Sequence, residues 1–468
     1  MSKKDKQFRF EKVTIGEMAA EGKCVARVND KVIFTEFLAP GDVADLRIYK
    51  TKKRFAFAKA EHIYEFSSSR TTPVCEHFGT CGGCKWQHIT YDNQALYKEK
   101  QVKDNLERIG KINVEEYLPI IQAKSTYNYR NKLEFSFSDK RWLTNEEIAT
   151  EDNLNDMNGL GFHVPERFDK VLDVKKCHLQ QEPSNAIRLE VRKFAVENDI
   201  PFYNLREHFG VLRNLIIRNS SLGELMVILQ VREFTDKVNL LLEHLKTTFP
   251  DITSLQYVVN QKSNDTFHDL DIHLFHGKSY ITEQMENLHF RVSPKSFYQT
   301  NSIQAYELYK VTRDFAGLTG NENVYDLYTG TGTIANFVAG RAKKVTGIEY
   351  VPMAIEDAKI NSSINNISNT SFYAGDVKDI LTASFLEKEG APDVIITDPP
   401  RAGMHEHVIK KILELAPQRI VYVSCNPATQ ARDLALLNEK YAVKKVRPVD
   451  MFPQTHHVEN VALLEKIN

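Results

Sequence analysis

The last third of the chain alternates apolar strand-like runs with helical patterns, and this alternation limits the possible fold more than any other feature. From about Phe290 onward the apolar runs fall at residues 322–327, 344–349, 392–398 and 419–425. Continuous apolar strands between helices predict an α/β fold with a parallel sheet covered on both faces. Ligands of such a sheet bind at the carboxyl ends of its strands. We therefore expect the functional residues where these strands end.

The first strand leads into a glycine-rich turn and a helix start, at residues 325–335. Gly330 and Gly332 would let the backbone approach a ligand closely, and Glu349, which closes the next strand, can accept hydrogen bonds from both hydroxyls of a ribose. The spacing also fits a dinucleotide fingerprint. This loop alone therefore leaves both a nicotinamide cofactor and S-adenosylmethionine open.

Two further strand ends favour the methyl donor. Asp376 follows the third strand, where it could reach an adenine amino group, and Asp398 opens the sequence Asp-Pro-Pro-Arg after the fourth. The prolines fix an extended turn that hydride transfer does not require. Capping aspartates would explain each turn singly but not all of them together. Arg401 stands where an enzyme that methylates exocyclic nitrogens would carry an aromatic residue, which weakens that alternative.

Cys425 lies where the next strand ends and a helix begins. A helix N-terminus is expected to lower the pKa of a nearby thiol, and the Asn426-Pro427 turn favours an exposed side chain over an inert buried cysteine. A thiolate beside a methyl donor could add to carbon 6 of uracil, so that carbon 5 becomes nucleophilic. A base must then remove the carbon 5 proton, and Glu459 is the best-placed carboxylate. His456 and His457 are rivals, which we interpret as capping or substrate-contacting residues.

With these motifs the chain resembles the RNA 5-methyluridine methyltransferases, specifically the bacterial 23S ribosomal RNA uracil-5-methyltransferases. The matching pieces are Ser-Cys-Asn-Pro around Cys425, Asp-Pro-Pro-Arg-Ala-Gly from Asp398, and His-Val-Glu-Asn-Val around Glu459. The resemblance implies a Rossmann-like methyltransferase domain in which Cys425 is the nucleophile and Glu459 the base. RNA 5-methylcytosine enzymes commonly use a second cysteine after a proline, which the catalytic half of this chain lacks.

The resemblance also implies the contacts to S-adenosylmethionine. Gln299 matches a Phe-Gln-x-Asn element, although Tyr298 is inserted before it, and Thr333 stands where many members carry Asn. The implied donor-binding residues are Gln299, Tyr328, Thr333, Glu349, Asp376 and Asp398.

The N-terminal residues 8–66 alternate short apolar and polar runs broken by turns, which predicts a small antiparallel barrel. Residues 47–59 carry six basic side chains interleaved with Tyr49, Phe55 and Phe57. Basic groups hold phosphates and aromatic faces stack on bases, so this region suits RNA, although a charged edge strand would look similar. The family resemblance implies an OB-like TRAM barrel here.

Three of the six cysteines lie within ten residues, at Cys75, Cys81 and Cys84. In a reducing compartment such a group indicates metal ligands, and Cys177 is the remaining candidate for a fourth. Four thiolates suit a [4Fe–4S] cluster or a tetrahedral zinc, and the spacing alone leaves the two evenly balanced. The resemblance implies the iron–sulfur cluster, in an α+β central domain that binds RNA.

We predict three domains, at residues 1–66, 67–290 and 291–468. From Tyr91 to Ile109 the pattern is helical, with Leu96, Val102, Leu106 and Ile109 on a common stripe. The resemblance implies that a helix from Tyr91 to about Lys124 packs on the catalytic domain. No run of eighteen apolar residues occurs, so we expect a cytoplasmic protein without a membrane partner. The oligomeric state stays open, with a monomer as the default.

Two alternative functions remain from the sequence. A transfer-RNA uracil-5-methyltransferase would share the catalytic core but typically lacks the barrel and the cysteine group, and a non-catalytic RNA-binding iron–sulfur protein would need no methyl donor. The net charge of −1 gives no support for nucleic-acid binding by itself.

Overall fold

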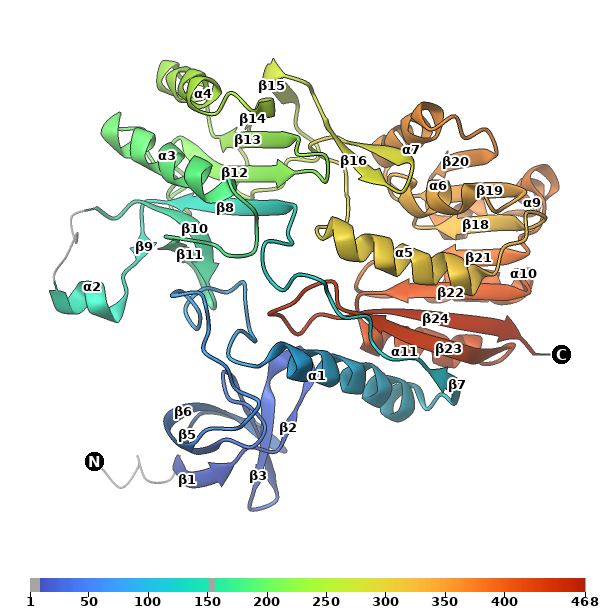
Figure 1. The fold of residues 1–468 in the computed structure, drawn as a ribbon, viewed down its shortest axis with the longest axis horizontal. Helices are drawn as coiled ribbons and strands as arrows, with labels where there is room; N and C mark the ends of the chain where they lie inside the picture. Colours follow the sequence, from blue (N-terminus) through green and yellow to red (C-terminus); the bar gives the residue numbers. More distant parts are fainter. Residues whose placement is uncertain (1–8, 151–155, 468) are drawn as a thin grey trace.

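The computed structural model describes residues 9–150 and 156–467. Its C-terminal part is built on a sheet of eight strands in the spatial order β20-β19-β18-β21-β22-β24-β23-β7 (Figure 1). The strands are β18 (Asn323–Leu327), β19 (Lys344–Glu349), β20 (Thr370–Ala374), β21 (Val394–Thr397), β22 (Arg419–Ser424), β23 (Tyr441–Val449), β24 (Glu459–Lys466) and β7 (Val114–Tyr117). Strands β18 to β22 pair in parallel, as predicted, and β24 runs antiparallel to β22.

Alternate residues of this catalytic sheet enter two separate cores, as the pleat of a strand requires. Val324 and Val421 belong to one core, whereas Tyr325 and Ile420 belong to the other. The first core is completed by α5 (Ser302–Ala316), α6 (Thr333–Ala339) and α7 (Pro352–Ile364). The second is completed by α8 (Val377–Ile380), α9 (Ala383–Glu389), α10 (Glu406–Leu415) and α11 (Pro427–Leu437). The expected helical cover on both faces is therefore confirmed.

The helix predicted from Tyr91 to about Lys124 is shorter, and its buried stripe differs. Helix α1 (Tyr91–Asp104) continues into a π-helical turn (Asn105–Gly110), after which β7 joins the edge of the catalytic sheet beside β23. Lys111, in the left-handed region at φ 51°, ends the helical segment. Val102 and Leu106 are buried as expected, but Leu96 and Ile109 are 57% and 58% exposed. Gln94 and Lys98 are buried on this helix instead, because Gln454 and Asp450 supply polar partners for them.

The central part contains a second sheet of eight strands, in the order β15-β14-β13-β12-β8-β10-β11-β9. Helices α3 and α4 pack on one core of this sheet. The elements are β8 (Lys132–Ser138), β9 (Arg141–Trp142), α2 (Asn145–Thr150), β10 (Gly159–Val164), β11 (Arg167–Asp173), α3 (Ser184–Glu197), β12 (Leu212–Asn219), β13 (Leu225–Val231), α4 (Asp236–Thr248), β14 (Ile252–Val259) and β15 (Ile272–Gly277). A two-stranded ribbon of β16 (Ile281–Met285) and β17 (Leu288–Val292) leads into α5.

The N-terminal part is a six-stranded sheet in the order β1-β5-β6-β4-β3-β2, seen in blue in Figure 1. It closes around its own core, which includes Val13, Cys24 and Leu46. The strands are β1 (Arg9–Thr14), β2 (Glu17–Met18), β3 (Cys24–Val28), β4 (Lys31–Thr35), β5 (Val43–Thr51) and β6 (Phe55–Glu65), with a 3-10 turn at Ala20–Gly22. Within the described residues, none of the helices has the length and apolar character needed to cross a bilayer.

Candidate functional site

The carboxyl ends of the parallel strands bring most of the predicted site residues to one edge of the catalytic sheet. Each parallel strand contributes one of these residues at or just after its end. In spatial order they are Asp376 after β20, Glu349 at the end of β19, Tyr328 after β18, Asp398 after β21 and Cys425 after β22. Glu459 joins them because β24 runs the other way and begins there. The chain reverses its direction of strand addition at β18, which is the usual ligand position of an open α/β sheet. The predicted donor residues thus lie beside the predicted catalytic pair.

The glycine loop after β18 approaches Glu349 closely. The Gly330 N–H donates to Glu349 Oε2 at 3.2 Å, and the Val351 N–H donates to Oε1 at 2.9 Å. Both glycines have positive φ, and a Cβ on Gly332 would come within 2.8 Å of the Ala358 Cβ, whereas one on Gly330 would meet open space. The loop therefore packs on one side and leaves room for a ligand on the other.

The remaining predicted donor positions flank this loop. Thr333 begins α6 with its Oγ1 3.3 Å from Thr331 Oγ1. Gln299 is buried ahead of α5, and its carbonyl accepts a hydrogen bond from Asn131 Nδ2 at 2.9 Å. Asp376 caps α8 and forms an ion pair of 3.0 Å with Lys378. Its carboxylate is thus already engaged at the mouth of the site.

Cys425 and Glu459 face each other across two neighbouring strands. Ser424 and Asn460 are the last pair of the β22–β24 ladder, and Cys425 and Glu459 are the residues next to them at this edge. Neighbouring strands lie about 4.8 Å apart, which brings the thiol and the carboxyl into one small volume. The Asp398 N–H donates to the Leu327 carbonyl at 3.3 Å, which fixes a second carboxyl on the adjoining β21. Three acidic groups therefore converge at this edge.

Burial and the neighbouring acidic groups raise the pKa of each of these groups. Burial, followed by the charge of Asp398, raises the pKa of Glu459 well above its usual range. Burial and then Asp326 raise the pKa of Asp398 to about 7. The expectation of a lowered thiol pKa is wrong for this structure, since burial and the two carboxyls raise the pKa of Cys425 to about 11 despite the adjacent helix. Desolvation outweighs the partial charge of the helix end here.

The two histidines before Glu459 are poor candidates for a base near neutral pH. Their rings lie 4.2 Å apart, and burial lowers the pKa of His456 to about 4 and that of His457 to about 3. Both are therefore neutral and weakly basic. Glu459, with its raised pKa, is the stronger proton acceptor of the three.

The four predicted metal-binding cysteines line one cavity of about 120 Å³ between the loop before α1 and the loop before α3. The Lys175 N–H donates to His77 Nε2 at 2.8 Å and joins the two loops, while Asn185 Oδ1 accepts from the Cys177 N–H at 2.8 Å. Burial raises the pKa of Cys81 to about 12 and that of Cys84 to about 11. Thiols in such a site ionise only beside a strong positive charge. The cysteines in this cavity are Cys75, Cys81, Cys84 and Cys177.

These thiols are not gathered around a single point. In the part of the chain that the structure describes, no three Cys, His, Asp or Glu side chains converge closely enough to hold one metal ion. The arrangement therefore offers no preformed tetrahedral zinc site among the described residues.

Comparisons with known proteins place this site in a family. A model of tRNA (uracil-5-)-methyltransferases matches residues 270–467, and a TRAM domain model matches residues 5–60. An uncharacterized RNA methyltransferase of Bacteroides thetaiotaomicron is 60% identical over 96% of this chain and 100% of its own. One from Porphyromonas gingivalis is 56% identical over 96% of this chain and 98% of its own.

The chain belongs to the RNA uracil-5-methyltransferase family with a TRAM domain. This methyltransferase is an S-adenosylmethionine-dependent enzyme, as predicted. Its structure is also similar to that of the Pyrococcus abyssi tRNA (uracil-54, C5)-methyltransferase in complex with S-adenosyl-L-homocysteine. The TM-score is 0.74 at 29% identity, covering 96% of this chain and 99% of that one. The match covers 96% of this chain and so includes part of the barrel, which means that a barrel alone does not separate this chain from transfer-RNA enzymes.

Sequence reasoning missed the polar residues that anchor the segment before Glu459. Lys98 Nζ lies 2.6 Å from Asp450 Oδ1, and both side chains are fully buried. Tyr91 also donates to Asp450, at 3.0 Å. A lysine on the apolar stripe of a helical pattern was the available signal, because a buried lysine requires a partner.

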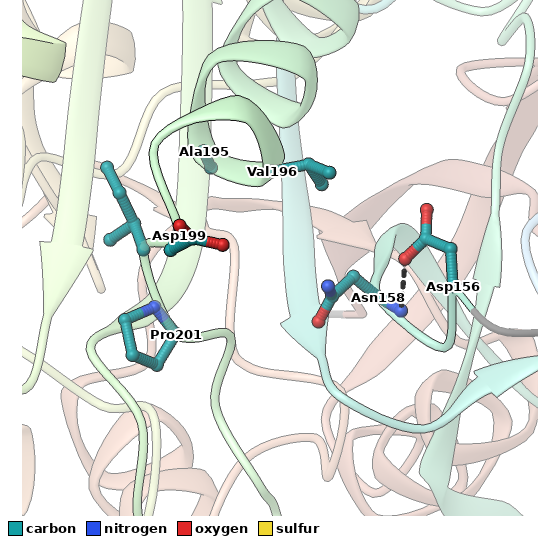
Figure 2. A pocket seen from close by; sticks show the side chains of 7 residues that line it. Asp156, Asn158, Ala195, Val196, Asp199 and Pro201 are labelled. Atoms are coloured by element: carbon teal, nitrogen blue, oxygen red, sulfur yellow. Dashed lines mark hydrogen bonds between the residues drawn. The ribbon is translucent and has the colours of Figure 1, made fainter.

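A larger cavity of the methyltransferase, about 470 Å³, lies at the C-terminal end of α3 (Figure 2). It is lined by Asp156, Asn158, Ala195, Val196, Asp199, Ile200 and Pro201, none of them a predicted site residue. The Asp156 carboxylate is already paired with Arg192 at 2.8 Å and accepts from the Asn158 N–H at 3.0 Å. This cavity therefore offers no chemistry related to methyl transfer.

Proposed function

We propose that this methyltransferase methylates carbon 5 of a uridine in folded RNA through a covalent bond between Cys425 Sγ and carbon 6 of the base. The observation that carries the proposal is the position of Cys425 and Glu459 next to the last β22–β24 pair, at the sheet edge that also carries the glycine loop. The nucleophile and the base must reach the same uracil ring, the nucleophile at carbon 6 and the base at the adjacent carbon 5. Adjacent strand ends supply that separation.

In the net reaction a methyl group replaces the proton on carbon 5, and the Cys425 thiolate is regenerated. The Cys425 thiolate adds to carbon 6, and the electron pair of the carbon 5–carbon 6 double bond forms an enolate. Carbon 5 then takes the methyl group from the donor's sulfonium, which becomes a neutral thioether. The Glu459 carboxylate removes the carbon 5 proton, the double bond re-forms, and the sulfur–carbon bond breaks to release the thiolate. The uridine must leave its stack to reach this edge.

The donor is proposed to lie along the glycine loop. Glu349 would accept from its ribose and Asp376 from its adenine, in place of Lys378, which pairs with Asp376 in this structure. The full proposed set is Gln299, Tyr328, Thr333, Glu349, Asp376 and Asp398, with Asp398 and Gln299 orienting base and donor. The open space beside Gly330 supports this placement.

The four-cysteine cavity is proposed to hold a [4Fe–4S] cluster. Four thiols around a buried cavity fit a group with four ligand positions, and a cube of iron and sulfide has a wider footprint than one zinc ion. The cluster would supply the positive charge that lets Cys75, Cys81, Cys84 and Cys177 ionise. Methyl transfer moves no net electrons, so these cysteines would tie two loops together and hold an RNA-binding surface.

The proposed substrate is 23S ribosomal RNA, on the basis of the four-cysteine group, which transfer-RNA uracil-5-methyltransferases typically lack. Transfer RNA is the second candidate, favoured by the similarity to the Pyrococcus abyssi tRNA enzyme over nearly the whole chain. Mass mapping of 5-methyluridine in both RNAs, from cells with and without this gene, distinguishes them. Loss of a methyl group from 23S RNA alone supports the first candidate, loss from transfer RNA supports the second, and loss from neither contradicts both.

A further inference from the structure

The segment that leads into Glu459 is irregular yet almost fully enclosed. Between β23 and β24 the chain runs through residues 450–458, of which Asp450, Gln454 and Val458 are at most 4% exposed. Gln454 has φ 68°, a left-handed conformation that a non-glycine residue adopts only when its surroundings impose it. We call residues 450–458 the base loop. A strained, enclosed loop next to a predicted catalytic base raises the question of what holds it.

The side chain of Gln94 in α1 forms hydrogen bonds with this loop and with the residues just before α1. Its Oε1 accepts from the Gln454 N–H at 2.9 Å, and its Nε2 donates to Gln454 Oε1 at 3.0 Å. The same Nε2 lies 3.0 Å from the Trp86 carbonyl and 2.8 Å from the Ile89 carbonyl. Gln94 is fully buried, so losing these bonds would leave polar groups without water.

The backbone carbonyl of Gln454 joins the base loop to the loop that carries Cys75, Cys81 and Cys84, which we call the cysteine loop. Its carbonyl accepts from the Lys85 N–H at 2.9 Å and from the Trp86 N–H at 3.0 Å. These two residues follow Cys84 directly. Trp86 is itself fully buried, and its Nε1 donates to the Gly22 carbonyl of the barrel at 3.2 Å. Gln454 is therefore the point where helix α1, the cysteine loop and the base loop are hydrogen-bonded together.

We propose that Gln94 and Gln454 are positioning residues that hold the Glu459 carboxyl against carbon 5 of the bound pyrimidine. The inference rests on the proposed function. Cys425 lies just beyond the end of β22 and outside the base loop, whereas Glu459 begins β24 directly after that loop and pairs with Val449, the residue that precedes it. Loosening the loop should therefore slow proton removal and release, which need Glu459, while sparing the addition of Cys425, which does not.

The test compares two RNA substrates with Gln94→Met, which keeps the side-chain length but removes all four bonds. With uridine RNA, the covalent enzyme–RNA complex should accumulate on denaturing gels and turnover should fall by about tenfold. 5-Fluorouridine RNA blocks the release step in the variant and the unchanged protein alike. With this RNA, the trapping rate of Gln94→Met should match that of the unchanged protein. Gln256→Met is the matched control, because Gln256 is equally buried but lies in β14, bonded to Ser254.

A second variant keeps the test informative if Gln94→Met does not fold. Gln454→Gly suits the positive φ and removes only the bond between the two amides, so it should fold and show the same accumulation to a smaller degree. If neither variant accumulates the complex, or if both substrates slow equally, the positioning role is overturned. If the unchanged protein traps no 5-fluorouridine RNA, the proposed function fails instead.

Discussion

Replacing Glu459 by glutamine should change the ionisation of Cys425 in a direction that the site geometry fixes. The pKa of Cys425 stands at about 11 in the absence of RNA, because of burial first and the charges of Glu459 and Asp398 next. At pH 8 about 0.1% of such a thiol is ionised, against about a quarter of an ordinary one, so its reactivity should be about 200-fold lower. Glu459→Gln removes one of the two charges and leaves the burial. The pKa should therefore fall without reaching that of a free cysteine.

The assay is alkylation of Cys425 by iodoacetamide across pH, followed by mass spectrometry of its peptide. Because the thiolate forms as pH rises through the pKa, the rate should rise about tenfold per pH unit until near pH 11 in the unchanged protein. In Glu459→Gln the half-maximal rate should move to lower pH. A half-maximal rate near pH 8.5 in the unchanged protein, or no movement in the variant, would refute the reasoning.

Three further predictions follow from other parts of the molecule. Lys98→Met should lower the free energy of unfolding in urea by about 3–5 kcal/mol, because Asp450 is left buried without its cation. Adding Asp450→Leu should recover most of this loss. An unaltered urea midpoint in the single variant would contradict the prediction. Glu349→Gln should weaken binding of S-adenosylmethionine about tenfold by calorimetry, since it loses charged hydrogen-bond acceptors, and an unchanged Kd would exclude that contact. Cys177→Ala should abolish the visible absorption of the proposed cluster and weaken RNA binding more than donor binding, whereas unchanged absorption would exclude Cys177 as a ligand.

The sheet and its reactive edge were predictable because local patterns determine them. Apolar runs between helical patterns require a parallel sheet, and the chemistry-bearing residues follow those runs directly, as Glu349 and Asp398 do. The closeness of Cys425 and Glu459 was harder to predict. It depends on β24 entering the sheet antiparallel beside β22, which follows from no property of either strand alone.

The environment of helix α1 could not be predicted from its own sequence. Leu96 and Ile109 fit a helical stripe, yet the buried face holds Gln94 and Lys98. These polar side chains are buried because Gln454 and Asp450, more than 350 positions later, supply partners for them. A helical pattern records the period of burial but not the identity of the distant groups that make polar burial tolerable.

The pKa of Cys425 was mispredicted for a related reason. A helix start is visible in sequence at Asn426 and Pro427, so its favourable effect on a thiolate was expected. The opposing effects come from burial and from carboxyls on two other strands, which only the folded sheet brings together. In the proposed mechanism, Cys425 must therefore lose its proton as the sulfur adds to carbon 6.

The central claim is that the sulfur of Cys425 bonds to the pyrimidine, and trapping measures this directly. The purified protein is mixed with S-adenosylmethionine and RNA that carries 5-fluorouridine, because fluorine cannot leave as a proton. We predict a protein–RNA complex that survives denaturation, with the modified peptide containing Cys425 and with no complex in Cys425→Ala. A complex that persists in Cys425→Ala, or maps to another residue, would contradict the account.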